Sequence, residues 1–106
     1  MTGHCSVYIT APDLETALWI ARALVEEKLA ACANILGPIT SVFRWEGRVV
    51  EEGEVALIAK TTADHVEALT ARVKALHPYE VPCIVAWPIA AGYQPYLDWI
   101  SAETSS

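Results

Sequence analysis

The densest cluster of chemically versatile side chains lies in LHPYEVP, residues 76–82, and in the cysteine that follows it. His77, Glu80 and Cys83 offer a nitrogen, an oxygen and a sulfur, the donor atoms that hold copper and other transition metals. Pro78 and Pro82 restrict the loop between them. One interpretation of this segment is therefore that these three side chains converge on a metal ion.

A structural alternative explains the same residues as a stiff corner between a helix and a strand. His77 then caps the helix C-terminus, where positive charge is favoured, and Cys83 is a small core residue. Tyr79 buries its ring and keeps its hydroxyl bonded, and Glu80 accepts hydrogen bonds towards a neighbouring subunit. The residues alone leave both interpretations open.

The N-terminus offers a second metal site. Met1 is followed by the small residue Thr2, which permits removal of the initiator methionine, so the chain would begin Thr2-Gly3-His4. The free amine, two amides and the imidazole of His4 supply four nitrogens in a plane, the set that Cu(II) and Ni(II) favour. Cys5 adds a thiol nearby. The alternative is an incidental histidine on a frayed terminus.

Other motifs carry weaker signals. Four glutamates in EGRVVEEGE, residues 46–54, suit hard cations, but their spacing is not that of a calcium loop and favours a polar hairpin bend. The T-A-P-D turn at residues 10–13 offers helix amides to an anion. His65 is expected on the outer face of a helix, without a role. Without a phosphate loop, H-E-x-x-H or G-x-S-x-G, the sequence favours a protein that is not an enzyme.

Composition restricts the class of protein. The 106 residues suffice for one domain, residues 1–106, with flexible tails expected at 1–4 and 102–106. A net charge of −6 disfavours nucleic acid, and no apolar run is long enough for membrane insertion. The three cysteines lack a paired spacing and the N-terminus lacks a signal peptide, so we expect a cytoplasmic protein with free thiols.

Hydrophobic periodicity predicts the order of the elements. Strands are expected over residues 5–10, 30–45 with a break at Gly37-Pro38, 54–61 and 83–89. Helices are expected from Pro12 to Lys28, from about Asp64 to Leu76 and over residues 96–100. The order β-α-β-β-α-β predicts an α+β, ferredoxin-like fold with a short C-terminal helix.

The predicted sheet is apolar on both faces, although its two helices can cover only one of them. Two helices cover one face, yet the third and fourth strands are apolar on both, as Ala56 and Ile58 illustrate. A large bare apolar face is unusual, so a partner is expected to cover it, most simply another copy of the chain.

Long segments of the chain resemble the CutA divalent-cation tolerance family. They are TAPDLETALWIARALVEEKLAACANIL, SVFRWEGRV, EVALIAKTTADHVEAL, LHPYEVP and YLDWI, in order from about Ser6 to Ile100. The resemblance implies a ferredoxin-like subunit in a stable homotrimer, in which long strands of neighbouring subunits pair. It also implies a link to tolerance of copper and other divalent metals, and a likeness to PII-type signalling trimers that bind small ligands between subunits.

Metal-binding relatives carry a cysteine before T-A-P-D and a His-His pair before P-Y. The corresponding residues here are Ile9, Leu76 and His77, so only His77 matches. The leading prediction is a cytoplasmic homotrimer that binds Cu(I), Cu(II) or another divalent cation, with no obligatory cofactor and no turnover.

Two alternatives accompany this prediction. The first is a PII-like sensor that binds a small molecule or partner in an intersubunit cleft near Trp45, Lys60, Tyr79 and Glu80. The second is a hydrolase that uses an intersubunit carboxylate or thiol, Glu80 or Cys83.

Overall fold

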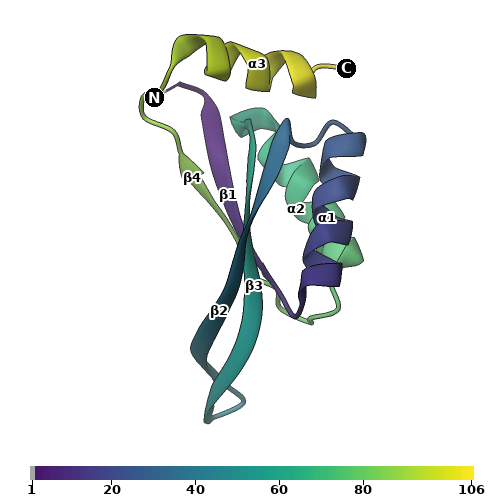
Figure 1. The fold of residues 1–106 in the computed structure, drawn as a ribbon, viewed down its shortest axis with the longest axis vertical. Coiled ribbons are helices and arrows are strands. Elements are labelled where there is room, and N and C mark those ends of the chain that lie inside the picture. Colours follow the sequence, from purple (N-terminus) through teal and green to yellow (C-terminus); the bar gives the residue numbers. More distant parts are fainter. Residues whose placement is uncertain (1) are drawn as a thin grey trace.

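The computed structural model describes residues 2–106, and its strands and helices follow the predicted order (Figure 1). The elements are β1 His4–Ala11, α1 Leu14–Glu26, β2 Cys32–Trp45, β3 Arg48–Thr62, a 3₁₀ turn η1 Ala63–His65, α2 Val66–Leu76, β4 Ile84–Pro88 and α3 Gln94–Thr104. The β-α-β-β-α-β order and the additional terminal helix are thus confirmed.

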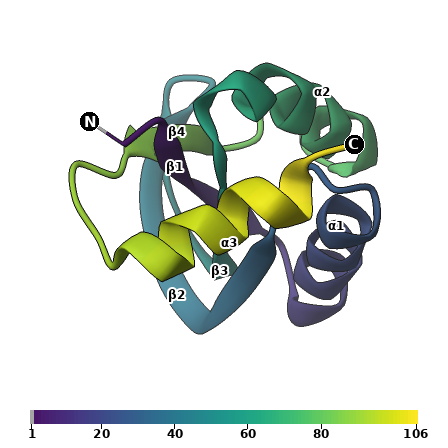
Figure 2. The ribbon, with the colours of Figure 1, turned by 90° about the horizontal axis from the view of Figure 1, so that it is seen from above.

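The four strands form one antiparallel sheet in the order β2-β3-β1-β4. Both α1 and α2 lie on one face of this sheet, while α3 crosses the ends of the strands (Figure 2). The largest side chains of the main core are Val7, Ile9, Ile20, Leu24, Leu57, Leu69 and Val73. A smaller cluster joins α3 to the sheet through Ala31, Leu97 and Ile100. The face opposite α1 and α2 is therefore available for other contacts.

The strands β2 and β3 continue beyond β1 as a two-stranded arm, residues 39–54, which we call the hairpin arm (Figure 1). The predicted bend over residues 46–54 is wrong, because Trp45 pairs with Arg48 and the turn is Glu46-Gly47 alone. Both turn residues have positive φ, 49° and 79°, as two-residue hairpin turns require. The glutamates of this segment suggested a loop. A two-stranded ribbon that is exposed on both faces, however, can be polar on both and need not alternate apolar with polar residues.

The predicted break in the long second strand is confirmed. The register of β2 on β3 shifts between Ile35 and Gly37, and Gly37 has a φ of 107°. This φ is accessible mainly to glycine, which explains the residue type at the bulge. Pro38 follows on β2, which is an edge strand of the sheet. Proline has no N–H to donate, and on the unpaired side of an edge strand this loses no hydrogen bond to a neighbouring strand.

The ends of two elements differ from the prediction. His4 belongs to β1 and is buried, and α3 continues through Thr104, whose side chain is also buried. Of the predicted tails at 1–4 and 102–106, His4 thus lies within β1 and residues 102–104 lie within α3. Asp13 precedes α1 and caps it by accepting a 2.8 Å hydrogen bond from the Thr16 N–H. The T-A-P-D aspartate thus has a structural role.

Candidate binding groove

A groove of about 810 Å³ opens between the hairpin arm, β1 and the loop after α2. We call it the hairpin groove; it is lined by Tyr8, Thr10, Ser41, Val42, Phe43, Trp45, Glu52, Glu54 and residues 78–83. Small-molecule sites typically occupy about 300–1,000 Å³. The groove is therefore large enough for a small organic ligand.

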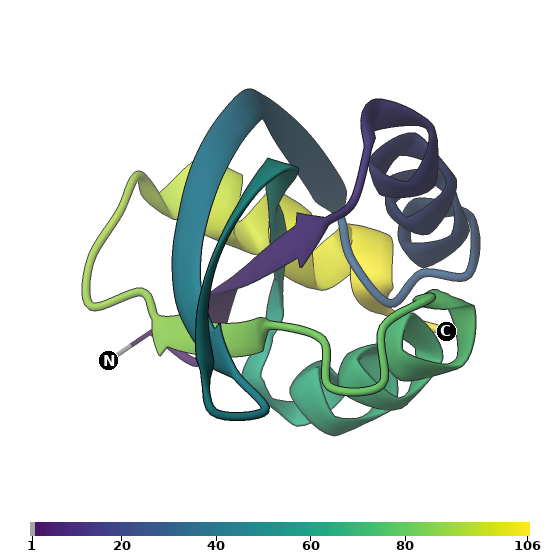
Figure 3. The ribbon, with the colours of Figure 1, turned by 90° about the horizontal axis from the view of Figure 1, so that it is seen from below.

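Strand alternation places the groove on the face opposite α1 and α2. Tyr8 and Thr10 alternate with the core residues Val7 and Ile9 along β1 and so project to the open face. Glu54 lies on the same face of β3, because its neighbour Val55 is in the core. Figure 3, the view onto the tip of the arm, shows the connection from α2 to β4 that supplies the other wall.

Tyr79 and Glu54 form the polar centre of the groove. The Tyr79 hydroxyl donates a 3.2 Å hydrogen bond to the carboxylate of Glu54, a residue that is 8% exposed. Burial raises the pKa of Tyr79 to about 12, and the charge of Glu54 and this hydrogen bond add to the effect. The phenol therefore stays protonated at neutral pH and acts as a donor. Glu54 was not predicted from the sequence.

His77 is buried beneath this pair, with both ring nitrogens engaged. Its Nδ1 accepts a hydrogen bond from the Tyr79 N–H at 3.2 Å, so the proton lies on Nε2, which donates to the Thr10 carbonyl at 2.7 Å. Coordination of a metal ion through either nitrogen would break one of these buried bonds. His77 is the C-cap residue of α2 through its backbone N–H, but its ring bonds to β1 and to Tyr79 and not to the carbonyls of the helix end that the corner interpretation expected.

Glu80 and Cys83 line the hairpin groove with Tyr79, whereas His77, the third ligand expected with them, does not. Burial is the main cause that raises the pKa of the Cys83 thiol; a hydrogen bond with Thr10 opposes it and the charge of Glu54 adds to it. A protonated thiol is a poor nucleophile, and it must release its proton before it can bind a soft metal ion. Within residues 2–106 no three His, Cys, Asp or Glu side chains are arranged to hold a metal ion.

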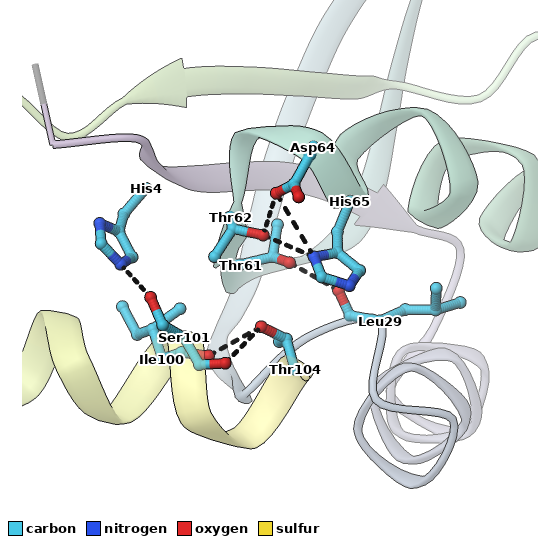
Figure 4. A network of polar contacts seen from close by, with 9 residues as sticks. All are labelled: His4, Leu29, Thr61, Thr62, Asp64, His65, Ile100, Ser101 and Thr104. Atoms are coloured by element: carbon cyan, nitrogen blue, oxygen red, sulfur yellow. Dashed lines mark hydrogen bonds and ion pairs between the residues drawn. The ribbon is translucent and has the colours of Figure 1, made fainter. Parts of the chain in front are cut away.

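His4 is held in the fold rather than on a free terminus (Figure 4). Its Nε2 lies 2.8 Å from the Ser101 Oγ on α3, and its buried Nδ1 has no hydrogen-bond partner. The Thr2 N–H donates to the Ile89 carbonyl and the Gly3 carbonyl accepts from Ala63. A planar copper site on Thr2-Gly3-His4 would require these residues to detach, and Met1, on whose removal it depends, lies outside the described residues.

The second histidine in Figure 4, His65, is the last residue of η1 and its ring contacts the side chain of Thr62, the residue before η1. Its Nδ1 and the Asp64 carboxylate both contact the Thr62 hydroxyl, at 2.5 and 2.6 Å. Thr61, the next residue towards the core, donates to the Leu29 carbonyl. These contacts join β3 to the following turn. The His65 and Asp64 side chains are engaged in them and do not form a free set of metal ligands.

Of the four residues predicted for a ligand cleft, three lie together. Trp45, Tyr79 and Glu80 line the hairpin groove. Lys60 does not, because it lies further along β3 than Glu54, towards α2, and donates to the Asn34 side chain at 3.1 Å. Within one chain the predicted cleft is therefore incomplete and carries no basic group.

Sequence reasoning missed Glu52, Glu54, Tyr8 and Phe43 as groove residues. The signal was Gly47, since glycine is common in two-residue hairpin turns, although Glu-Gly is not one of the pairs that mark them. With that turn, strand pairing places Glu54 opposite Ile39 and Glu52 opposite Ser41, on one face. The fold of the loop over the arm had no comparable signal, because it depends on tertiary packing.

Comparisons with known proteins agree with this architecture. A family model described as CutA1 divalent ion tolerance protein matches residues 5–103. The divalent-cation tolerance protein CutA of Thermus thermophilus is 56% identical over 98 residues, which cover 92% of this chain and 95% of that protein. Protein CutA of Homo sapiens is 43% identical over 101 residues, and the chain spans 56% of its length.

Solved structures extend the agreement to the fold. The structure of Cut A1 from Thermus thermophilus gives a TM-score of 0.94 at 54% identity, and the match covers 96% of this chain and 99% of that one. CutA from Archaeoglobus fulgidus, described as a periplasmic divalent cation tolerance protein, gives 0.93 at 47% identity with the same coverage. The names of these relatives mention tolerance and no reaction. On matches that span nearly its whole length, the chain belongs to the CutA1 divalent ion tolerance family.

Proposed function

We propose that this chain acts in tolerance to divalent cations as a cytoplasmic homotrimer that binds copper or another divalent cation and turns over no substrate. The family match over residues 5–103 carries the proposal. Among residues 2–106 no helix is long and apolar enough to cross a membrane. Relatives include a protein described as periplasmic and another described as chloroplastic, so location is a separate test by fractionation.

Large apolar side chains that a single chain leaves exposed to solvent support the assembly of several copies. On the open face and the arm, large apolar groups are exposed: Val42, Phe43, Trp45, Val49, Val85 and Trp87. β2 is also an edge strand of 14 residues whose outer side is unpaired. Long unpaired edges promote association, and native proteins normally cover them. A second and third copy of the chain would cover both features.

Metal binding in this proposal uses Glu80 and Cys83, because both lie in the open groove. His77 would add a third ligand only by giving up a buried hydrogen bond. One chain therefore lacks a complete set of three ligands, and we propose that a neighbouring copy supplies the remainder. Alternatively His4 binds Cu(II) after the terminus detaches.

A copper titration tests this proposal. Cu(I), under anaerobic conditions, and Cu(II) are titrated into tag-free protein whose intact mass shows whether Met1 is retained. We expect one tight site per subunit that Cys83→Ser abolishes and the control Cys32→Ser retains. Loss in His4→Ala alone would place the site at the terminus, and loss in His77→Ala would make the corner a ligand site. An absence of tight binding in the unaltered protein would overturn the metal proposal.

A second function, small-ligand sensing of the PII type, is favoured by the hairpin groove itself. The groove gathers Trp45, Tyr79 and Glu80 in a volume of about 810 Å³. A small molecule that raises the melting temperature of metal-free protein, and loses this effect in Tyr79→Phe, would support this function.

A further inference from the structure

We propose that Ser101 on α3 is the positioning residue of a Cu(II) site on Thr2-Gly3-His4, and that the ring nitrogen which binds the metal is Nδ1 of His4. This inference rests on the terminal site given above as the alternative to the groove, and it deepens that alternative by naming how the site is held. In a chain that begins at Thr2, the amine, the amides of Gly3 and His4 and one ring nitrogen bind the metal in a plane.

The covalent structure of histidine decides which ring nitrogen completes this plane. Nδ1 is close in the bonded structure to the backbone nitrogen of the same residue, so a metal bound to both closes a small chelate ring. Nε2 lies on the far side of the imidazole and cannot reach a metal that its own backbone nitrogen holds. In the structure Nε2 is engaged with the Ser101 Oγ at 2.8 Å, while Nδ1 has no hydrogen-bond partner among residues 2–106. The nitrogen that the chelate requires is thus the one that the fold leaves unbonded.

The missing partner of Nδ1 is a property of the chain's own fold. His4 is 9% exposed, and its Nδ1 is enclosed by atoms of the same chain. A neighbouring copy cannot reach this atom unless the terminus rearranges, so assembly does not supply the partner. A buried polar atom without a partner is unfavourable, and a metal ion bound at Nδ1 removes this cost.

The contacts that the terminus gives up to bind a metal lie outside the strand ladders. The N–H and hydroxyl of Thr2 both donate to the Ile89 carbonyl, and the His4 N–H donates to the Thr2 hydroxyl at 3.2 Å. The pairing of β1 with β3 begins at His4, after Thr2 and Gly3. Gly3 has a φ of 78°, and glycine adopts a wide range of other conformations. Thr2 and Gly3 can therefore close around a metal while the His4 ring stays in place.

Ser101 keeps the ring in place. When Nδ1 binds a metal, the ring proton must lie on Nε2, and the Ser101 Oγ accepts it. Figure 4 shows Ser101 on one side of the His4 ring and Nδ1 turned away from it. Metal-binding histidines usually donate their second ring N–H in this way, which fixes the orientation of the ring and strengthens it as a ligand. Leu97 and Ile100 anchor α3 independently of the terminus.

A Cu(II) titration of the full, tag-free Cys83→Ser protein tests this inference, because this variant lacks the thiol of the groove site. Intact mass shows whether the chain begins at Thr2. We expect one Cu(II) per chain, no tight binding in His4→Ala, and about tenfold weaker binding in Ser101→Ala. Ser101→Thr keeps a hydroxyl at this position and should restore the affinity.

Tyr96→Phe is the matched control for the packing of α3. It removes a different contact of this helix, the one between the Tyr96 hydroxyl and the Cys32 Sγ, and leaves the bond between His4 and Ser101 intact. We expect its affinity for Cu(II) to be unchanged. Equal weakening in Tyr96→Phe and Ser101→Ala would show that the packing of α3 matters rather than the bond to His4, and would overturn the inference.

The other outcomes separate the inference from the proposal on which it rests. Full affinity in Ser101→Ala, with binding lost in His4→Ala, would overturn the inference and retain the terminal site. Retention of Met1, Cu(II) binding that persists in His4→Ala, or no tight Cu(II) binding in Cys83→Ser would overturn both. Anaerobic Cu(I) binding that depends on Cys83 is a separate result, and it decides the groove site alone.

Discussion

Both histidines with a predicted role in copper binding have structural hydrogen bonds. His77 connects the Thr10 carbonyl to the Tyr79 N–H, and His4 connects β1 to Ser101 on α3. A buried histidine that is fully bonded has no lone pair to offer a metal, and His77 is in this state. His4 differs, since its Nδ1 is buried without a partner. The two residues therefore offer different prospects for metal chemistry although they are the same type.

Tyr79 should ionise late in an alkaline titration. Burial, and then the charge of Glu54, raises its pKa from 10.0 to about 12. The unfolded chain releases this proton more readily, so the contribution to stability is complete below pH 10 and is lost as the pH rises through about 12. We expect Glu54→Gln to lower the pKa of Tyr79, measured by tyrosinate absorbance with Tyr79→Phe as the reference.

Tyr96 provides an internal comparison for this titration. Its pKa is also raised to about 12, chiefly by a hydrogen bond with Cys32, so Glu54→Gln should leave it unchanged. Ionisation of Tyr79 at the same pH in both proteins would contradict the proposed coupling to Glu54.

At the scale of the element, the hairpin arm determines where the groove lies. The arm begins after the bulge at Gly37 and ends in the Glu46-Gly47 turn, and its position over the loop depends on the twist of both strands. The arm contributes Trp45 and Glu52 to the groove lining. Changes to the bulge should therefore affect stability and groove geometry together.

Gly37→Ala should destabilise the protein by about 1–3 kcal/mol, because its φ of 107° is unfavourable for a residue with a Cβ. The space around Gly37 is open, so the cost is one of backbone conformation and not of collision. The matched control is Gly53→Ala in β3, which also meets open space but lacks a positive φ. Denaturant unfolding measures both, and an equal effect in the two variants would contradict this explanation.

The sequence predicted the structure correctly where a residue type fits only a few backbone conformations. The pair Gly37-Pro38 predicted the bulge because few conformations accommodate it. The glutamates of residues 51–54 misled because polarity does not distinguish a loop from a strand exposed on both faces. The pairing of Tyr79 with Glu54 was beyond prediction, since it joins residues 25 apart through the packing of a loop on the arm.

At the scale of the whole molecule, the distribution of apolar groups supports association. The main core between the sheet and α1 and α2 is complete, while Trp45, Val85 and Trp87 remain exposed on other surfaces. The exposed side chains are distributed over the arm and β4 rather than on a single element. A single partner site would not cover them all, whereas a ring of copies would.

Ile58→Asp tests the proposed homotrimer. Ile58 is half-buried on the open face of β3, opposite Tyr8, so a neighbouring copy would enclose the new carboxylate. An enclosed unpaired charge costs several kcal/mol, and we expect dissociation by sedimentation at low micromolar concentration. Ala71→Asp adds the same charge on the exposed side of α2 and should leave the mass unchanged. A well-folded monomer of the unaltered protein would contradict the proposal.

The two-residue turn at Glu46-Gly47 has a consequence for the order of folding. The arm closes by bringing together residues that are adjacent in the chain, whereas β1 meets β4 by pairing Cys5 with Pro88. Short loops lose less entropy on closure, so we expect the β2-β3 ribbon to form first and the β1-β4 ladder to complete the sheet last. During synthesis the residues of β2 and β3 are made before those of β4. A nascent chain therefore presents a long unpaired strand edge early, and it requires protection from other nascent chains until its own neighbours arrive.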